Sequence, residues 1–324
     1  MKKLLVYISF ILLALSSCIV ESAECDRVGT TTIDIHIFND NAGTKAVPYA
    51  IENGISDLSL FIYDNEGNLV YSTYMSEFQE MISVEVQYNH NYYIYAVANV
   101  GDLTENTECA TRSQIEELYR DFVNYNYIVN DDEYLHLSAK KEIFVSEEVN
   151  TVPLPLKRMV CKFTIIVDKS QLSSDVSRFN VRVVRVENYN RRVYYFKESK
   201  LEESAFNYYH FRYMANDTPI YTTGEIFYIT ENMHGNLLSG NTSEVTHRPP
   251  SGYRNLCTMI EIAVSYKNSE FTNSQLLYRF YLHDGLNLDN FDVKRNTEYK
   301  CTLIPVGEGI EYSWRVDNSS MEYL

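Results

Sequence analysis

The clearest indication of the fold lies in ISDLSLFIYDNEGNLVYSTYM, residues 55–75. Leu58, Leu60 and Ile62 recur at every second position, which is the period of a β-strand with one face on a core. Residues 64–68 then supply the Asp, Asn and Gly types that favour a tight turn, and a second strand-like run follows them directly. This stretch therefore predicts a β-hairpin.

The same period-two alternation recurs on both sides of this hairpin and along most of the chain. Further examples are Ile33, Ile35 and Ile37; Ile82, Val84, Val86 and Tyr88; and Ile260, Ile262, Val264 and Tyr266. Tyrosine, with 28 copies, suits such strands because its ring packs on a core while its hydroxyl reaches water. With 324 residues to accommodate, we predict an all-β protein of two tandem β-sandwich domains.

One segment, TRSQIEELYRDFVNYNYIV at residues 111–129, breaks the alternation. Its apolar side chains fall on one helical face, formed by Ile115, Leu118, Tyr119 and Phe122. Ser113 and Glu116 have the spacing of a capping box, which satisfies free amides at a helix start. We expect one short helix, inserted in the first domain and packed on a sheet.

The segment PLPL, residues 153–156, precedes a strongly apolar run. Proline has no amide hydrogen to donate to a central ladder, so an edge strand or a connector is expected here. This makes the segment the best candidate for a domain boundary. We therefore predict an N-terminal β-sandwich domain over residues 18–152 and a C-terminal one over residues 153–324.

The first residues, MKKLLVYISFILLALSSC, have the basic start and apolar core of a secretory signal. The apolar run is shorter than the roughly 20 residues of a transmembrane helix. Its end, Leu15-Ser16-Ser17-Cys18, resembles the bacterial lipobox, where only a thiolate is nucleophilic enough to accept a diacylglyceryl group. We predict a lipoprotein signal peptide over residues 1–17 and lipidation at Cys18. Ordinary secretion with a chance cysteine is the alternative.

The charge balance argues against a nucleic-acid partner. There are 28 basic and 44 acidic residues, a formal net charge of −16, whereas affinity for phosphate backbones needs clustered Lys and Arg. Five cysteines follow Cys18, and their odd number and irregular spacing are not those of a disulfide framework. The sequence leaves open whether one or two disulfide bonds form. Cys161 and Cys301 lie in strand-like runs, where we expect buried free thiols.

The sequence contains no motif of a known catalytic or nucleotide-binding class. It has no G-x-S-x-G elbow, no H-E-x-x-H pair, no Walker loop and no G-x-G-x-x-G. Its seven histidines are scattered, and Asp284, Asn287, Asp289 and Asp292 imitate a calcium loop but lack its bend glycine and terminal glutamate. We therefore predict no enzyme activity, no metal and no cofactor.

Five segments, read in order, resemble the fimbrillin superfamily of Bacteroidales surface proteins, whose members build or decorate type V pili. They are ISDLSLFIYDNEGNLVYSTYM (55–75), YYIYAVANVGDL (92–103), PLPLKRMVCKFTIIVD (153–168), EIFYITENMHGNLL (225–238) and YRFYLHDGLNLDNFDVKRNTEYKCTLIP (278–305). The resemblance implies that both domains are transthyretin-like β-sandwiches. It covers nearly the whole chain after the signal peptide.

The resemblance also implies a mechanism of assembly. Shaft subunits of the family lose their first strand to a protease that cuts after a basic residue, and a strand from another subunit fills the slot, which is strand addition. Here the first strand would be residues 30–38, and the following loop offers Lys45 where the family has arginine. Lys45 is thus the candidate processing site, and an ordinary solvated lysine is the alternative.

Without that cut the first strand stays in place and the lipid stays attached. The C-terminal residues SWRVDNSSMEYL are also too polar to supply a long donor strand. The resemblance therefore implies a surface-exposed anchor, accessory or tip subunit in fimbriae, held in the outer membrane by its lipid. Its partners would be fimbrial subunits.

A second hypothesis is a glycan-binding outer-membrane lipoprotein of a nutrient-uptake system. Such proteins stack sugars on aromatic platforms, and Trp314 is the single tryptophan here. A third, a hydrolase, has no motif in its favour.

Overall fold

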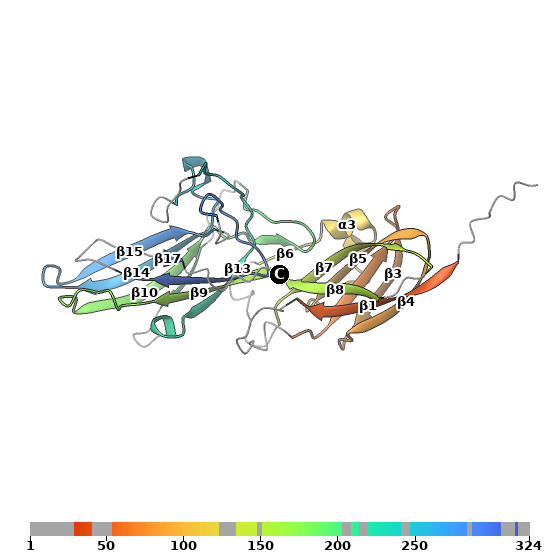
Figure 1. The fold of residues 1–324 in the computed structure, drawn as a ribbon, viewed down its shortest axis with the longest axis horizontal. Helices are drawn as coiled ribbons and strands as arrows, with labels where there is room; N and C mark the ends of the chain where they lie inside the picture. The colour runs from red at the N-terminus through yellow and green to blue at the C-terminus, as the bar shows by residue number, and fades with distance from the viewer. Residues whose placement is uncertain are drawn as a thin grey trace, which may run out of the picture.

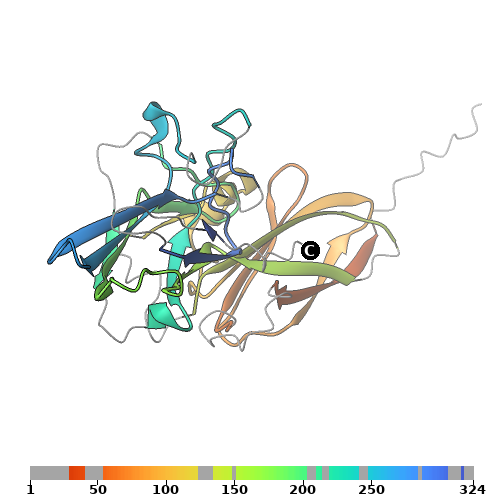
Figure 2. The same ribbon diagram turned by 60° about the vertical axis from the view of Figure 1, so that its left-hand side comes forward.

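The computed structural model describes residues 29–40, 54–122, 134–147, 151–202, 209–213, 219–240, 247–283, 287–305 and 315–316. Two β-rich halves lie end to end along the long axis (Figure 1), and they remain adjacent when the molecule is turned (Figure 2). The all-β class predicted from the alternation is confirmed, since strands dominate the described residues and α3 (Arg112–Glu116) is a single short helix among them.

The N-terminal half contains a sheet of order β3-β2-β5-β7-β8-β1-β4. Its strands are β1 (Thr30–Asn39), β2 (Leu58–Tyr63), β3 (Leu69–Met75), β4 (Met81–Gln87), β5 (His90–Ala98), β7 (Leu137–Val145) and β8 (Thr151–Arg158). Strands β7 and β8 share only two register positions, at Leu137 and Ser138. The sheet therefore folds over at this corner into two layers, β3-β2-β5-β7 and β8-β1-β4, whose facing side chains form one buried cluster.

The C-terminal half contains two four-stranded sheets around a second core, with orders β12-β10-β14-β15 and β13-β9-β16-β17. The strands are β9 (Val160–Val167), β10 (Arg178–Glu187), β12 (Tyr209–Tyr213), β13 (Glu225–Thr230), β14 (Met259–Lys267), β15 (Ser274–Tyr281), β16 (Glu298–Leu303) and β17 (Arg315–Val316). Short 3₁₀ turns lie at η3 (Pro219–Tyr221) and η4 (Ser251–Tyr253).

The two halves repeat one strand order. The first strand of each half, β1 or β9, lies between an antiparallel neighbour, β4 or β13, and a parallel one, β8 or β16. The second layer follows the same order, with β3-β2-β5-β7 in one half and β12-β10-β14-β15 in the other. This correspondence places β8 with the N-terminal sheet and leaves Met159 between the halves. The domain boundary predicted between residues 152 and 153 falls within β8, and the division into domains stays a prediction.

The predicted hairpin forms as expected. Asp64 accepts a hydrogen bond from the amide of Asn68 at 2.8 Å, and Gly67 has a φ of 89°, which glycine adopts without a Cβ clash. However, β2 is buried along its whole length and not on one face only. The reason is a third cluster, in which Phe61 and Tyr63 on the outer face of β2 are covered by residues from both halves.

The predicted helix is present but shorter, since α3 covers only Arg112–Glu116. Its N-cap is Thr111, whose hydroxyl accepts from the amide of Gln114, so the predicted capping box at Ser113 is wrong. Beyond the helix, Tyr119–Asp121 form strand β6, which pairs with β11 (Arg192–Tyr194). The chain leaves the helical course because this partner strand comes from the other half of the molecule.

Candidate functional site

The first strand, β1, lies inside its layer and not at an edge. It runs antiparallel along β4 and parallel along β8. Ile33, Ile35 and Ile37 point inward, and each is 0% exposed. The three side chains are spaced as the alternation predicts, and together they form an apolar plug.

Polar contacts hold β1 against both neighbours. The amide of Asp40 donates to the carbonyl of Leu156 on β8 at 2.9 Å. On the other side, the Ser83 hydroxyl of β4 donates to the Asp34 carboxylate at 2.6 Å. The strand is thus fixed by its ladders, its buried plug and side-chain contacts at its surface.

The side chains of β4 and β8 that pack against the plug are apolar. The plug packs in one cluster with buried residues from β4 and β8, namely Val84, Val86, Val152, Leu154 and Leu156. Burying each isoleucine of the plug contributes about 1.5–3 kcal/mol. Loss of β1 would leave an apolar slot between two unpaired strand edges, which is the arrangement that strand addition requires.

The proline-containing strand β8 fits the expectation of an edge. Among the described residues, Thr151–Leu156 pair with β1 alone, and pairing with β7 begins only at Lys157. The missing amide hydrogens of Pro153 and Pro155 therefore interrupt no central ladder.

The predicted lipidation site Cys18 and the predicted processing site Lys45 lie outside the described residues, as does Trp314. Lipidation and cleavage therefore stay predictions. Lys45 belongs to the segment that follows β1, and the last described residue before that segment is Asp40.

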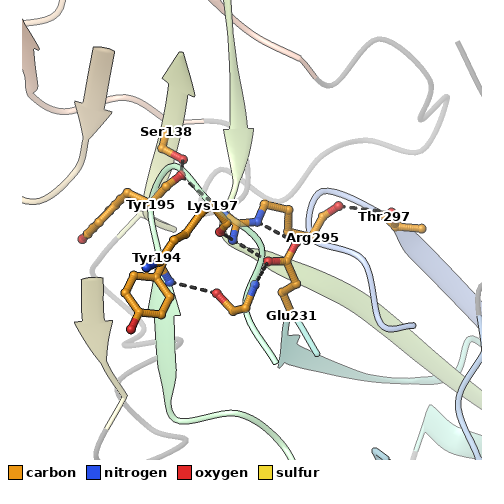
Figure 3. A network of polar contacts seen from close by, with 8 residues as sticks. Ser138, Tyr194, Tyr195, Lys197, Glu231, Arg295 and Thr297 are labelled. Atoms are coloured by element: carbon orange, nitrogen blue, oxygen red, sulfur yellow. Dashed lines mark hydrogen bonds and ion pairs between the residues drawn. The ribbon is translucent and has the colours of Figure 1, made fainter. Parts of the chain in front are cut away.

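A second constellation lies where the two halves meet (Figure 3). Glu231, directly after β13, binds Arg295 through two hydrogen bonds, from Nε at 2.8 Å and from Nη2 at 2.5 Å. The two side chains are 6% and 15% exposed, so solvent screens the pair weakly. Arg295 also donates to the backbone carbonyls of Tyr195 at 3.1 Å and Lys197 at 2.9 Å.

The residues beside this ion pair extend the contact. Asn232 accepts the amide of Leu201 at 2.8 Å, and it exchanges backbone hydrogen bonds with Val293. Asn296, with a φ of 55°, accepts from the amide of Arg158 at 3.2 Å, at the end of the N-terminal sheet. Two short motifs, Glu231-Asn232 and Arg295-Asn296, therefore meet at the junction.

Both motifs lie in segments that carry the family resemblance, but no role followed for them from the residues alone. A buried glutamate and a partly buried arginine 64 positions apart give no periodic signal. The one available signal is their charge within apolar surroundings, since buried ions in proteins are almost always paired.

The expectation that metal ligands are absent is not contradicted where the chain is described. There, no three His, Cys, Asp or Glu side chains come together in a way that could hold a metal ion. Asp292 instead accepts the amide of Gly235 at 2.6 Å, and Asn287 accepts that of Asp289 at 2.9 Å. These contacts are those of a polar turn.

The histidines are less isolated than their scatter in the sequence suggests. The ring of His247 lies 5.0 Å from that of His283 and stacks on Phe291 at 4.3 Å. Burial lowers the pKa of His247, which favours the neutral ring.

Cys161 and Cys301 are buried, as expected from their strand-like runs. Cys109, Cys161 and Cys257 are free and buried, and Cys301 is 0% exposed within the C-terminal core. Burial raises the pKa of the Cys161 thiol to about 12, so it is unreactive at neutral pH. Cys25 lies outside the described residues.

No helix in the described part of the chain is long and apolar enough to cross a bilayer.

Comparison with known proteins supports the fold. The profile of a domain of unknown function, DUF4906, matches residues 227–303, which run from β13 to β16. No curated protein matches the chain by sequence.

Solved structures match nearly the whole chain. A fimbrilin from Porphyromonas gingivalis aligns with a TM-score of 0.58 and 14% identity, covering 87% of this chain and 92% of its own. A candidate cell adhesion protein from Bacteroides eggerthii aligns with a TM-score of 0.55 and 14% identity, over 86% and 87%. Another from Parabacteroides distasonis gives 0.53 and 11%, over 90% and 96%. The resemblance to fimbrillins is thus confirmed at the level of the fold.

Proposed function

We propose that this chain is a lipid-anchored structural subunit of fimbriae on the cell surface, with an anchor, accessory or tip role and no enzyme activity. Its strand order is that of two repeated sandwich domains, and we assign both to the transthyretin-like type. Support comes from the similarity in fold to a fimbrilin and to candidate adhesion proteins, and from the resemblance of residues 15–18 to a lipobox.

The observation that carries the proposal is the seating of β1. A strand held between β4 and β8 by a plug of three fully buried isoleucines is suited to exchange, because its removal exposes a slot of matching length and polarity. Partners would be other fimbrial subunits, joined by strand addition, and the β1 slot itself can accept a strand only in a copy that has lost β1.

The processing loop distinguishes the role within a fimbria. Lys45 stands where the resemblance implies arginine, so a protease specific for arginine has no site in the loop between β1 and β2. The first strand then stays seated, and the lipid on Cys18 stays joined to the folded body. A subunit of this kind holds or ends a fimbria but does not extend it.

Mass spectrometry of the mature N-terminus, taken from native envelopes, tests both parts of the proposal. We expect a diacylglyceryl-modified Cys18 on a chain that retains residues 30–38. A mature chain that begins at Ala46 would show cleavage after Lys45 and would contradict the assignment.

Lipidation has a matched control in the same segment. Cys18→Ala should move the protein from the membrane fraction to the soluble fraction, because no acyl chain remains to bury CH₂ groups. Cys25→Ala, seven residues later, should stay in the membrane fraction. Equal fractionation of the two variants would refute anchoring through Cys18.

A further inference from the structure

The two halves of the molecule are joined by more than the backbone at Met159. Residues 192–201, which we name the strap, leave the C-terminal half after β10 and lie against the N-terminal half. Within the strap, β11 pairs with β6, and the amide of Tyr195 donates to the carbonyl of Leu118 at 3.0 Å. A segment of one half thus adds a strand to the other.

Side chains strengthen this grip on the N-terminal half. Phe196 is 5% exposed and packs edge-to-face on Tyr95, with ring centroids 4.9 Å apart. Arg192 binds both carboxylate oxygens of Asp121, at 3.0 and 3.2 Å. Edge-to-face ring packing in a buried setting is directional, so it fixes orientation as well as distance.

The other end of the strap is held by the C-terminal half. Glu231 accepts the amide of Ser199 at 2.8 Å, and Arg295 donates to the carbonyls of Tyr195 and Lys197. Asn232 accepts the amide of Leu201. The Glu231–Arg295 pair therefore acts as a clamp on the strap backbone.

One backbone carbonyl of the strap accepts hydrogen bonds from both halves. The carbonyl oxygen of Tyr195 accepts from the Ser138 hydroxyl of the N-terminal half at 2.8 Å and from Arg295 of the C-terminal half at 3.1 Å (Figure 3). A backbone group bonded from both sides cannot follow one half without the other. Relative rotation of the halves would break at least one of these hydrogen bonds, of which the first is buried and the second partly buried, and such a loss is costly.

We infer that the strap and its Glu231–Arg295 clamp lock the two halves in one orientation, so that the chain behaves as a single rigid unit. Domains joined by one chain crossing normally move relative to each other unless a large apolar interface prevents it. Here the buried cluster around Phe61, Tyr95 and Phe196 supplies that interface, and the clamp fixes it. The inference does not depend on the proposed fimbrial role.

The test measures the distance between the halves in the full chain. Spin labels are introduced through non-canonical amino acids, which spare the native cysteines, at two exposed positions: Gln87 on β4 and Leu277 on β15. Electron–electron double resonance then reports the distribution of distances. The unmodified strap should give one narrow peak.

Two variants each remove the contacts of the strap with one of the two halves. Arg295→Met removes the clamp, and Phe196→Ala removes the grip on Tyr95 without touching the clamp. Both should lose the single narrow peak and give a broad distribution. Arg279→Met is the matched control, because it breaks an arginine–glutamate contact to Glu261 at 2.6 Å that lies within the C-terminal half, and it should keep the narrow peak.

A peak as narrow as that of the wild type in either Arg295→Met or Phe196→Ala overturns the inference. Where Arg295→Met fails to fold, Arg295→Lys replaces it, since lysine keeps the charge but cannot bind the carboxylate and two carbonyls in one plane. Phe196→Ala perturbs only the N-terminal contact, so its result decides the question independently.

Discussion

Ile35→Ala tests whether β1 is a structural plug. Ile35 lies at the middle of the strand, opposite Ile82 of β4 and Val152 of β8, and it is 0% exposed. Replacing a buried isoleucine with alanine costs about 2–5 kcal/mol, from the lost transfer free energy and the cavity left behind. The site lies between two paired strands that cannot easily close over the gap, so we expect about 3 kcal/mol.

The effect should appear as faster hydrogen exchange of the β1 amides. A loss of about 3 kcal/mol in the free energy of opening corresponds to roughly two orders of magnitude in the exchange rate, because each 1.4 kcal/mol is tenfold. Exchange is followed by mass spectrometry on peptides that cover residues 30–39. Denaturant unfolding of the same variant should give a lower midpoint.

Thr32→Ala is the control within the same strand, since Thr32 points outward and is exposed. It should change the β1 exchange rate by less than about threefold, the effect of a surface substitution within roughly 0.5 kcal/mol. Equal exchange rates in Ile35→Ala and Thr32→Ala would refute the plug, and with it the argument that loss of β1 opens an apolar slot.

Two further predictions concern stability. Burial lowers the pKa of His136 to about 4 from an ordinary 6.5. The contribution of this shift to the free energy of unfolding is therefore complete above pH 6.5 and is lost as the pH falls toward 4. It amounts to no more than about 3 kcal/mol, because the residue is partly exposed. His136→Phe should flatten that part of the stability profile in denaturant titrations, and an unchanged slope between pH 6.5 and 4 would contradict it. Gly224→Ala should lower the melting temperature through a strain of at least about 1–3 kcal/mol, since φ is +94° and a Cβ would lie 2.5 Å from Thr164 Cγ2. Gly252→Ala, where a Cβ meets nothing within 4 Å, should leave it unchanged, and equal melting temperatures for the two variants would refute the strain argument.

The local signals in the sequence predicted most of the strands that seat β1. Period-two alternation located Ile33, Ile35 and Ile37 in one strand and placed them on its buried face. Turn chemistry located the hairpin between β2 and β3. These features succeed because strand period and turn preference are properties of a few adjacent residues, and the fold does not override them.

The extent of the helix could not be predicted from the same kind of signal. Tyr119 and Phe122 continue the helical face of α3, yet they lie in or beside β6, because β11 pairs there from a position some 70 residues later. Local preference is weak compared with burial in such an interface. The clamp was missed for the same reason, since Glu231 and Arg295 acquire their role only when distant segments meet.

The burial of β2 connects these outcomes. A strand of one sandwich needs a single apolar face, yet Phe61 and Tyr63 make the second face of β2 apolar as well. In isolation the N-terminal half would leave part of that face uncovered, and burial of each large side chain is worth about 1.5–3 kcal/mol. The cover comes from α3 and its neighbours within the N-terminal half, and from Val193, Tyr195 and Phe196 of the strap. The continuous apolar run in β2 is therefore explained by a buried cluster to which both halves contribute, and the sequence of the first domain already contains part of the surface on which the second is locked.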